Sequence, residues 1–78
     1  MLHRKRYSSV NGSRLRSLRQ SRGWTQVEFG RRAGYSERLI RKAESGGNLL
    51  VNTIDDLATA LSQINDVVSA ESLIEATG

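Results

Sequence analysis

Two helix-start signals that follow each other closely constrain the fold of this chain more than any other feature of its sequence. Thr25 can cap the backbone amide of Glu28, while the Glu28 side chain reaches back to the Thr25 amide. Trp24 and Phe29 occupy the apolar positions that flank such a cap and set the direction in which the chain enters the helix. The pattern predicts a helix over about residues 25–33.

The second start signal comes directly after this helix. Gly34 suits the left-handed conformation that ends a helix, and Ser36 is a good cap for the next one. Tyr35 and Ile40 take the flanking apolar positions, so a further helix is predicted over about residues 36–45. Because the link is so short, the two helices must cross steeply instead of lying antiparallel. This is the arrangement of a helix-turn-helix, which presents its second helix outward.

Three more helices are expected around this pair, which predicts an all-α, compact bundle of about five short helices. An apolar stripe indicates one helix ending at Arg22-Gly23, and a clear amphipathic repeat indicates another over residues 50–61. We expect residues 1–9 to form a flexible basic arm and residues 10–63 to form the helix-turn-helix domain. Residues 64–78 are expected to form a C-terminal segment with a short fifth helix, available for dimerisation.

The composition argues against an enzyme. The 78 residues include no cysteine and one histidine, His3, which all but excludes disulfides, thiolate metal sites and Ser-His catalysis. The carboxylates of the second half read as lying on exposed helix faces: Asp55, Asp56, Asp66, Glu71 and Glu75. We therefore expect no catalytic residue, no metal and no cofactor. The sequence also shows no signal peptide and no apolar run of membrane-spanning length, which predicts a cytoplasmic protein.

Charge is divided sharply along the chain. Residues 1–42 hold all twelve Lys and Arg residues against Glu28 and Glu37, a net charge of +10, whereas residues 43–78 hold six acidic residues and no basic one, a net charge of −6. This asymmetry indicates that the first half meets a polyanion. For Arg4-Lys5-Arg6 taken alone, a solvated basic surface is an equally good interpretation.

An ordered set of short segments extends over about residues 12–61 and consists of Leu15-Arg16-Ser17-Leu18-Arg19, Gly23-Trp24-Thr25-Gln26, Phe29-Gly30, Ala33-Gly34-Tyr35-Ser36, Ile40, Glu44, Thr53-Ile54 and Leu57-Ala58-Thr59-Ala60-Leu61. Together they resemble the Cro/cI-like helix-turn-helix regulators, also called the XRE family. The resemblance implies a lambda-repressor-like fold that binds double-stranded DNA, with the helix at residues 36–45 as the recognition helix in the major groove.

The resemblance also implies structural roles for several residues. Gly30 stands where the family usually has alanine, because two helices approach closely there; glycine fits but weakens the helix by ~1 kcal/mol. Arg19 and Glu44 correspond to a family ion pair beneath the motif, and losing one buried partner would cost ~3–5 kcal/mol. The alternative is that both are surface charges. Leu49 replaces a frequent proline, so we expect a less rigidly defined loop after the recognition helix.

Base contacts are assigned to the recognition helix by the same resemblance. Glu37, Arg38 and Lys42 map onto base-facing positions of the family, with Arg41 beside them. For Glu37 an alternative role is to stabilise the helix dipole without DNA. The usual small polar residue at the start of this helix is replaced by Glu37-Arg38, so analogy does not predict the operator sequence.

Backbone contacts are expected around the recognition helix. Gln26 maps onto a phosphate-binding position, and Asn48 is placed to offer backbone or side-chain donors. Arg31 and its neighbour Arg32 either add charge at the flank or are solvated. The run Arg4-Lys5-Arg6 could wrap the duplex as an arm. Trp24 and Tyr35 are expected to pack in the core instead of stacking on bases, as the flanking positions of the two caps indicate.

These observations predict a transcriptional regulator, most simply a repressor that binds a palindromic site as a homodimer, with recognition helices about 34 Å apart. Residues 62–78 would form the dimer surface, because their apolar side chains exceed what a small core needs. Other hypotheses remain open at this point. They are an antitoxin-like module that binds a partner protein, the DNA-binding domain of a longer regulator, a restriction-modification controller and non-specific nucleic-acid packaging.

Overall fold

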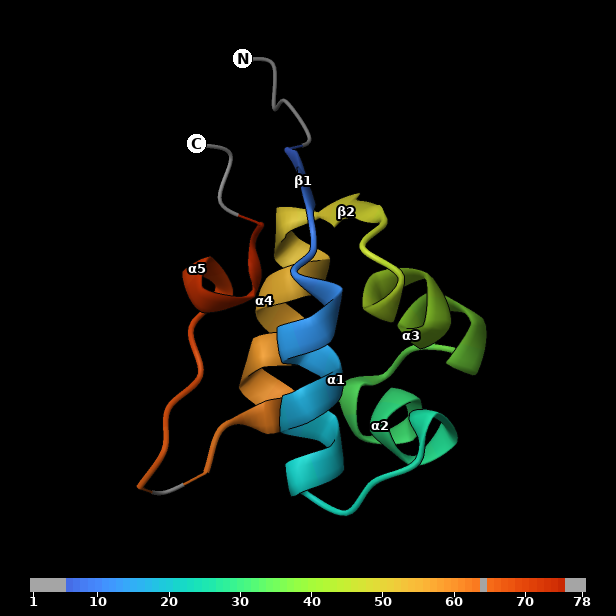
Figure 1. Ribbon diagram of the computed structural model, residues 1–78, viewed down its shortest axis with the longest axis vertical. Helices are drawn as coiled ribbons and strands as arrows, with labels where there is room; N and C mark the ends of the chain where they lie inside the picture. Colours follow the sequence, from blue (N-terminus) through green and yellow to red (C-terminus); the bar gives the residue numbers. More distant parts are fainter. Residues whose placement is uncertain (1–5, 64, 76–78) are drawn as a thin grey trace.

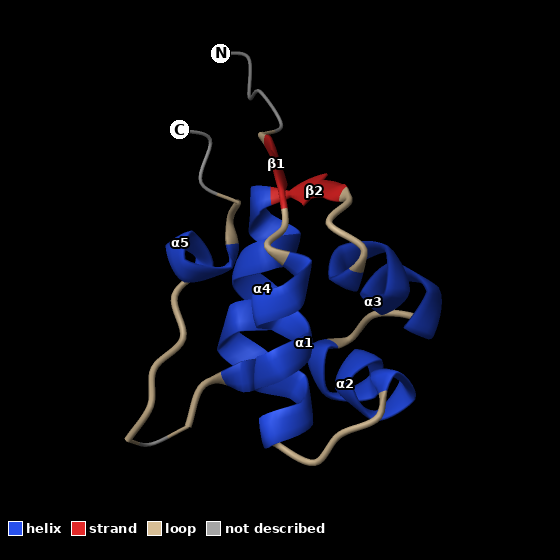
Figure 2. Cartoon of the chain, in the orientation of Figure 1, coloured by secondary structure: helices blue, strands red, loops and turns tan. Residues whose placement is uncertain are grey.

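The computed structural model describes residues 6–63 and 65–75, which form a small helical domain (Figure 1). Its elements in chain order are β1 (Tyr7–Ser9), α1 (Gly12–Ser21), α2 (Gln26–Ala33), α3 (Glu37–Glu44), β2 (Asn48–Leu50), α4 (Val51–Leu61) and α5 (Ala70–Leu73). The expected five helices are present, and a small two-stranded sheet that was not expected accompanies them (Figure 2). None of the described helices has the length and apolarity that a membrane crossing requires.

The caps predicted for the two central helices are formed. The Thr25 hydroxyl accepts a hydrogen bond from the Glu28 amide at 3.1 Å, and the Ser36 hydroxyl accepts one from the Leu39 amide at 3.2 Å. Gly34, between the helices, adopts the left-handed conformation with a φ of 84°. Local sequence therefore sets where α2 ends and where α3 begins.

One of the two hydrogen bonds predicted at the start of α2 is not formed. The Glu28 carboxylate lies 2.9 Å from Arg32 Nε and 3.8 Å from Arg31 Nη1, and it does not reach back to the Thr25 amide. The carboxylate instead pairs with arginines three and four residues further along the helix, a spacing that places side chains on the same helix face. The flanking aromatic pair is formed as predicted, with the rings of Trp24 and Phe29 6.0 Å apart.

The core lies where all five helices meet. Next to α3 lie α2 and α1, while α4 contacts α2, and α5 lies against α4 and α1. The largest fully buried side chains come from every helix and are Phe29, Leu15, Ile40, Ile54, Leu57, Leu61 and Leu73. Burying each such side chain contributes roughly 1.5–3 kcal/mol. This packing holds α3 by its inner face alone and leaves its outer face at the surface.

The two strands lie at one end of the domain and are antiparallel, with Ser8 opposite Leu49. On the other edge of β1, the Ser9 carbonyl accepts a hydrogen bond from the Glu75 amide at 2.8 Å. The expected flexible arm is therefore wrong for residues 6–9, and residues 1–5 lie outside the described part. Leu49 is only 4% exposed, so its burial makes this segment an ordered strand and not the loosely defined loop expected.

The C-terminal segment contains the short fifth helix that was expected. Helix α5 has four residues, and a turn closed by backbone hydrogen bonds between Gln63 and Asp66 precedes it. The Ser62 hydroxyl ends α4 by accepting a hydrogen bond from the Val68 amide at 3.0 Å, which turns the chain back onto the domain. Val68 and Leu73 are thereby buried in the chain's own core. Most of the apolar side chains that were expected to form a dimer surface are therefore buried within the domain itself.

Candidate nucleic-acid interface

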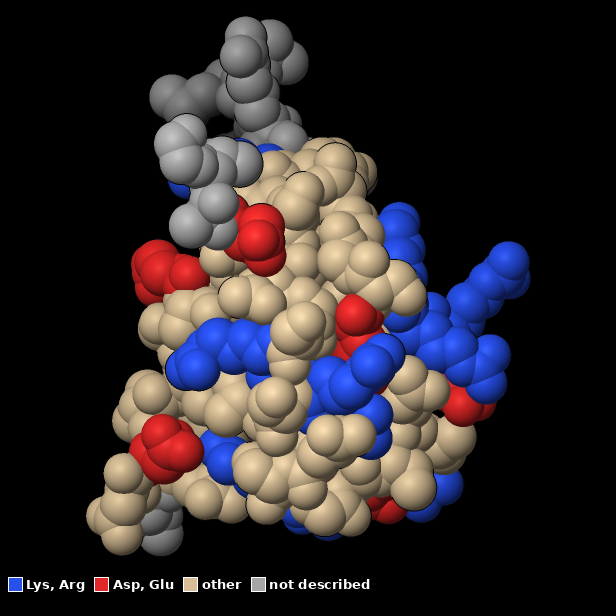
Figure 3. Space-filling view, viewed as in Figure 1, with Lys and Arg blue, Asp and Glu red and all other residues tan. Residues whose placement is uncertain are grey.

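The outer face of α3 is basic and exposed. Ile40 and Ala43 are fully buried and anchor the inner face, whereas Arg38, Arg41 and Lys42 are exposed. In the space-filling view, Lys and Arg side chains project from the edge of the molecule where Figure 1 shows α3 (Figure 3). The helix is thus held rigidly from one side and offers positive charge on the other.

Part of this charge is neutralised within the helix. Arg41 Nη2 lies 2.9 Å from Glu37 Oε2, one helical turn away. Within the part of the chain that the structure describes, Arg38 and Lys42 form no ion pair, so they carry the unbalanced charge of the face. An exposed pair of this kind contributes only about 0.3–0.5 kcal/mol, so Glu37 and Arg41 can exchange it for other contacts at little cost.

The turn between α2 and α3 is tightly packed. A Cβ atom on Gly30 would lie 2.6 Å from the carbonyl oxygen of Tyr35, which confirms the close approach expected there. The Tyr35 hydroxyl donates a hydrogen bond to Asp56 on α4, and this bond raises the pKa of Tyr35 above its ordinary value of 10.0. Tyr35 thus ties the turn to α4, and its partly buried side chain packs against the core.

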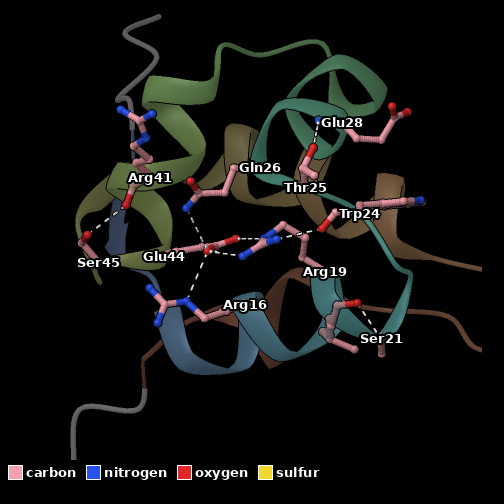
Figure 4. Close-up of polar contacts among 11 residues, drawn as sticks. Arg16, Arg19, Ser21, Trp24, Thr25, Gln26, Glu28, Arg41, Glu44 and Ser45 are labelled. Atoms are coloured by element: carbon pink, nitrogen blue, oxygen red, sulfur yellow. Dashed lines mark hydrogen bonds and ion pairs between the residues drawn. The ribbon is translucent and has the colours of Figure 1, made fainter.

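A buried carboxylate lies beneath the motif. The side chain of Glu44 is fully buried and accepts hydrogen bonds from Arg19, from Gln26 Nε2 at 3.2 Å and from Arg16 Nε at 3.4 Å (Figure 4). The implied ion pair between Arg19 and Glu44 is present, and two nitrogen atoms of Arg19 take part in it. Arg19 also donates to the Trp24 carbonyl at 2.8 Å, so the same side chain fixes the loop before α2.

The protonation of Glu44 follows from these contacts. Burial by itself raises the pKa of this carboxyl group, but hydrogen bonds from Arg19 and Gln26, the positive charge of Arg19 and the hydrogen bond from Arg16 outweigh it. The pKa of Glu44 therefore lies below its ordinary value of 4.5. The carboxylate is charged at neutral pH and joins α1, α2 and α3.

Comparison with known proteins agrees with this geometry. A family model described as a helix-turn-helix domain matches residues 12–64, which is more than half of the chain. The chain belongs to this helix-turn-helix family, in the Cro/cI-like class. No curated protein and no solved structure matches the chain. Membership in the helix-turn-helix family implies that this domain binds DNA.

The residues expected to contact the DNA backbone lie in different settings within the helix-turn-helix domain. The side-chain amide of Gln26 is bound to Glu44, whereas its backbone amide lies in the first turn of α2. Asn48 lies in β2, and its Oδ1 accepts a hydrogen bond from the Ser9 hydroxyl at 2.9 Å. Arg31 is exposed near Glu28. The structure brings Gln26 next to the end of α3 but does not join Asn48 or Arg31 to it.

Other basic residues make contacts outside α3. Arg32 stacks over the Trp24 ring, with its guanidinium carbon 4.7 Å from the ring centre, and Trp24 is partly buried against the core as expected. The carbonyl of Arg6 accepts a hydrogen bond from the Val51 amide at 2.8 Å. Arg4 and Lys5, assigned to a DNA-wrapping arm, lie outside the described residues.

Three residues of the helix-turn-helix domain have contacts in the structure that the sequence analysis did not assign to them. A Cβ atom on Gly12 would lie 2.2 Å from the Glu44 carbonyl oxygen, so only glycine lets α1 begin this close to α3. Arg22 donates to the Leu61 carbonyl at 2.6 Å and caps the end of α4. Arg16 contacts Glu44 from the exposed side. Its spacing of three residues from Arg19 was the one available signal, since such residues share a helix face.

Proposed function

We propose that the domain recognises a specific double-stranded DNA sequence with α3 in the major groove and regulates transcription as a repressor. The observation that carries the proposal is the outer face of α3, where Arg38 and Lys42 are exposed while Ile40 locks the opposite face into the core. A rigid helix with unbalanced positive charge suits the groove of a polyanion.

The side chains of α3 have distinct proposed roles. Arg38 and Lys42 donate to guanine edges, where each good base contact is worth ~1–3 kcal/mol of discrimination. Glu37 accepts from a cytosine amino group, and Arg41 either reads a neighbouring base or binds a phosphate once its pair with Glu37 opens. The helix-turn-helix arrangement supports these roles because the first turns of the recognition helix enter the groove.

The proposed backbone contacts flank α3. Because Glu44 holds the side-chain amide of Gln26, and because the Glu28 amide is bound to Thr25, we assign the phosphate contact to the backbone amides of Gln26 and Val27. These amides have no partner within the helix and point to where an anion binds favourably. Asn48 and Arg31 are assigned to phosphates on either side, Asn48 from β2 and Arg31 from the last turn of α2.

Homodimerisation on a palindromic site completes the proposal. Two recognition helices in successive major grooves would lie about 34 Å apart. In the expected dimer segment, residues 62–78, Val67 offers an apolar side chain that is 81% exposed. This is a small contribution, so the symmetry of the bound DNA is the more informative readout of dimer formation.

In vitro selection from a random duplex pool at about 0.15 M salt tests the proposal, because physiological salt suppresses non-specific binding. The wild type should enrich an inverted repeat. The double variant Arg38→Ala, Lys42→Ala should lose the enrichment, whereas Arg31→Ala should bind more weakly but enrich the same sequence. Binding without enrichment by the wild type would refute specific readout and favour non-specific packaging.

A further inference from the structure

One oxygen atom of the buried Glu44 collects contacts from two helices. Glu44 Oε1 lies 3.4 Å from Arg16 Nε, 3.1 Å from Arg19 Nη2 and 3.2 Å from Gln26 Nε2. Arg16 and Arg19 come from α1, and Gln26 from the first turn of α2 (Figure 4). Because Arg16 and Gln26 donate to the same atom, they are held side by side at the end of α3.

The two arginines differ in what they leave free. Arg19 donates through all three guanidinium nitrogens, to Glu44 and to the Trp24 carbonyl, and its side chain is 11% exposed. Arg16 has a side chain that is 55% exposed, and among the described residues it donates through Nε alone. Figure 4 shows the two terminal nitrogens of Arg16 pointing away from Glu44. Glu44 therefore holds the Nε of Arg16, while the two terminal nitrogens of Arg16 are available to bind another group.

The charge that this cluster presents outward is positive. Arg16 and Arg19 carry two positive charges against the one negative charge of Glu44, and the Glu44 carboxylate is fully buried whereas Arg16 is exposed. A guanidinium matches a phosphate in geometry and charge. An arginine that is already held in place loses less freedom on binding, which favours its use as an anion ligand.

We propose that Arg16 binds a phosphate of the DNA backbone, and that Glu44 acts as the positioning residue that aligns Arg16 with the start of α2. The inference rests on the proposed function and adds α1 to the interface. The outer nitrogens of Arg16 and the first-turn amides at Gln26 then bind neighbouring backbone oxygens on one side of α3. Glu44 itself does not touch the DNA.

The chain contains a matched control for this assignment. Arg14 lies two residues earlier on α1, is exposed, and faces a different side of the helix, where it lines a shallow groove with Ser17 and Leu18. Among the described residues, the side chains that bind Glu44 are those of Arg16, Arg19 and Gln26, and Arg14 is not one of them. Arg16→Gln and Arg14→Gln therefore remove the same charge from the same helix, but only one of them removes it from the Glu44 cluster.

The experiment measures the affinity of the full chain for the selected duplex and for an unrelated duplex over a range of salt concentrations. Arg16→Gln should lower affinity roughly five-fold at about 0.15 M salt and reduce the slope of log K against log salt by about 0.9, on both duplexes. Arg14→Gln should leave the slope unchanged. Arg16→Lys should keep the slope but lose part of the affinity, because lysine has no Nε–H for Glu44 to hold.

Each other outcome is decisive. An unchanged slope in Arg16→Gln, with a wild type that binds its selected site, overturns the phosphate contact and leaves the proposed function standing. A loss confined to the selected duplex makes Arg16 a base-reading residue and also overturns it. An Arg16→Lys variant with the affinity of the wild type overturns the positioning role of Glu44. If thermal unfolding shows that Arg16→Gln does not fold, the affinity of Arg16→Lys is the readout that tests the proposal. A wild type that binds no duplex refutes both proposals.

Discussion

At the scale of single residues, the stability of the domain should depend on pH through Glu44. Its pKa in the folded chain is lowered from 4.5, so its ion pairs stabilise the fold above that value and are lost as the pH falls through the lowered pKa. We expect the urea unfolding free energy to drop as the pH is lowered from about 5 to about 2.

Two variants isolate the contribution of Glu44. Glu44→Gln should be less stable at neutral pH, because it leaves Arg19 buried without a counter-charge, a loss of ~3–5 kcal/mol when one partner of a buried pair is removed. The difference from the wild type should shrink as the pH falls. Glu71→Gln, which alters an exposed carboxylate on α5, should follow the wild-type profile. A difference for Glu44→Gln that stays constant with pH would contradict the assigned pKa direction.

A second prediction at this scale concerns Gly30. Alanine would gain ~1 kcal/mol of helix propensity there. The structure nevertheless predicts a net loss of stability, because the new Cβ atom would lie 2.6 Å from the Tyr35 backbone oxygen. This oxygen cannot rotate away as a side chain does. Overpacking of this kind costs about 1–3 kcal/mol, so we expect Gly30→Ala to lower stability by about 1 kcal/mol in chemical denaturation. A higher unfolding midpoint would show that the turn relaxes freely.

The sequence predicted some residues of the candidate site well and missed others. Thr25 and Ser36 were predicted because a helix cap depends on residues a few positions apart. The pair of Arg19 and Glu44 was predicted only through the family resemblance, since 25 positions separate the two residues. Gly12 escaped prediction because its role appears only when α3 is placed against it.

At the scale of elements, the antiparallel pair of β1 and β2 is the feature that sequence patterns did not predict. Each strand has three residues, which is too short for an alternating pattern to emerge. Their pairing depends on contacts between distant segments, anchored by the buried Val10 and Leu49. The short helix α5 was expected, whereas the contact of Ser62 with Val68 that turns the chain after α4 was not predicted.

This pairing predicts that Ser8 cannot be replaced by proline without loss of stability. The Val10 amide donates to Gly47, and the Val51 amide donates to Arg6. By the alternation of an antiparallel ladder, Ser8 and Leu49 between them exchange backbone hydrogen bonds. Ser8→Pro should cost about 1–3 kcal/mol because it leaves a carbonyl unpaired, whereas Ser8→Ala should be nearly neutral. Equal melting temperatures for the two variants would indicate that residues 7–9 behave as the flexible arm first expected.

At the scale of the whole molecule, the segments around Val10 and Ile74, near the two ends of the described residues, close the same core. The Val10 segment pairs with Ile74, and the Asn11 amide donates to the Leu73 carbonyl at 2.7 Å. The basic face of α3 lies on another side of the domain (Figure 1, Figure 3). The C-terminal segment thus first serves the fold of one chain, which separates its contribution to stability from any contribution to dimerisation.

Leu73 and Val67 test this separation. Leu73 is fully buried, so Leu73→Ala should cost about 2–5 kcal/mol, as large-to-small substitutions in a core do. Because the loss arises within one chain, the unfolding midpoint should fall equally at low and high protein concentration. Val67→Ala removes a side chain that is 81% exposed and should leave the midpoint unchanged. If Leu73→Ala instead lowered the midpoint only at high concentration and reduced the sedimentation coefficient, the segment would stabilise a dimer more than the single domain.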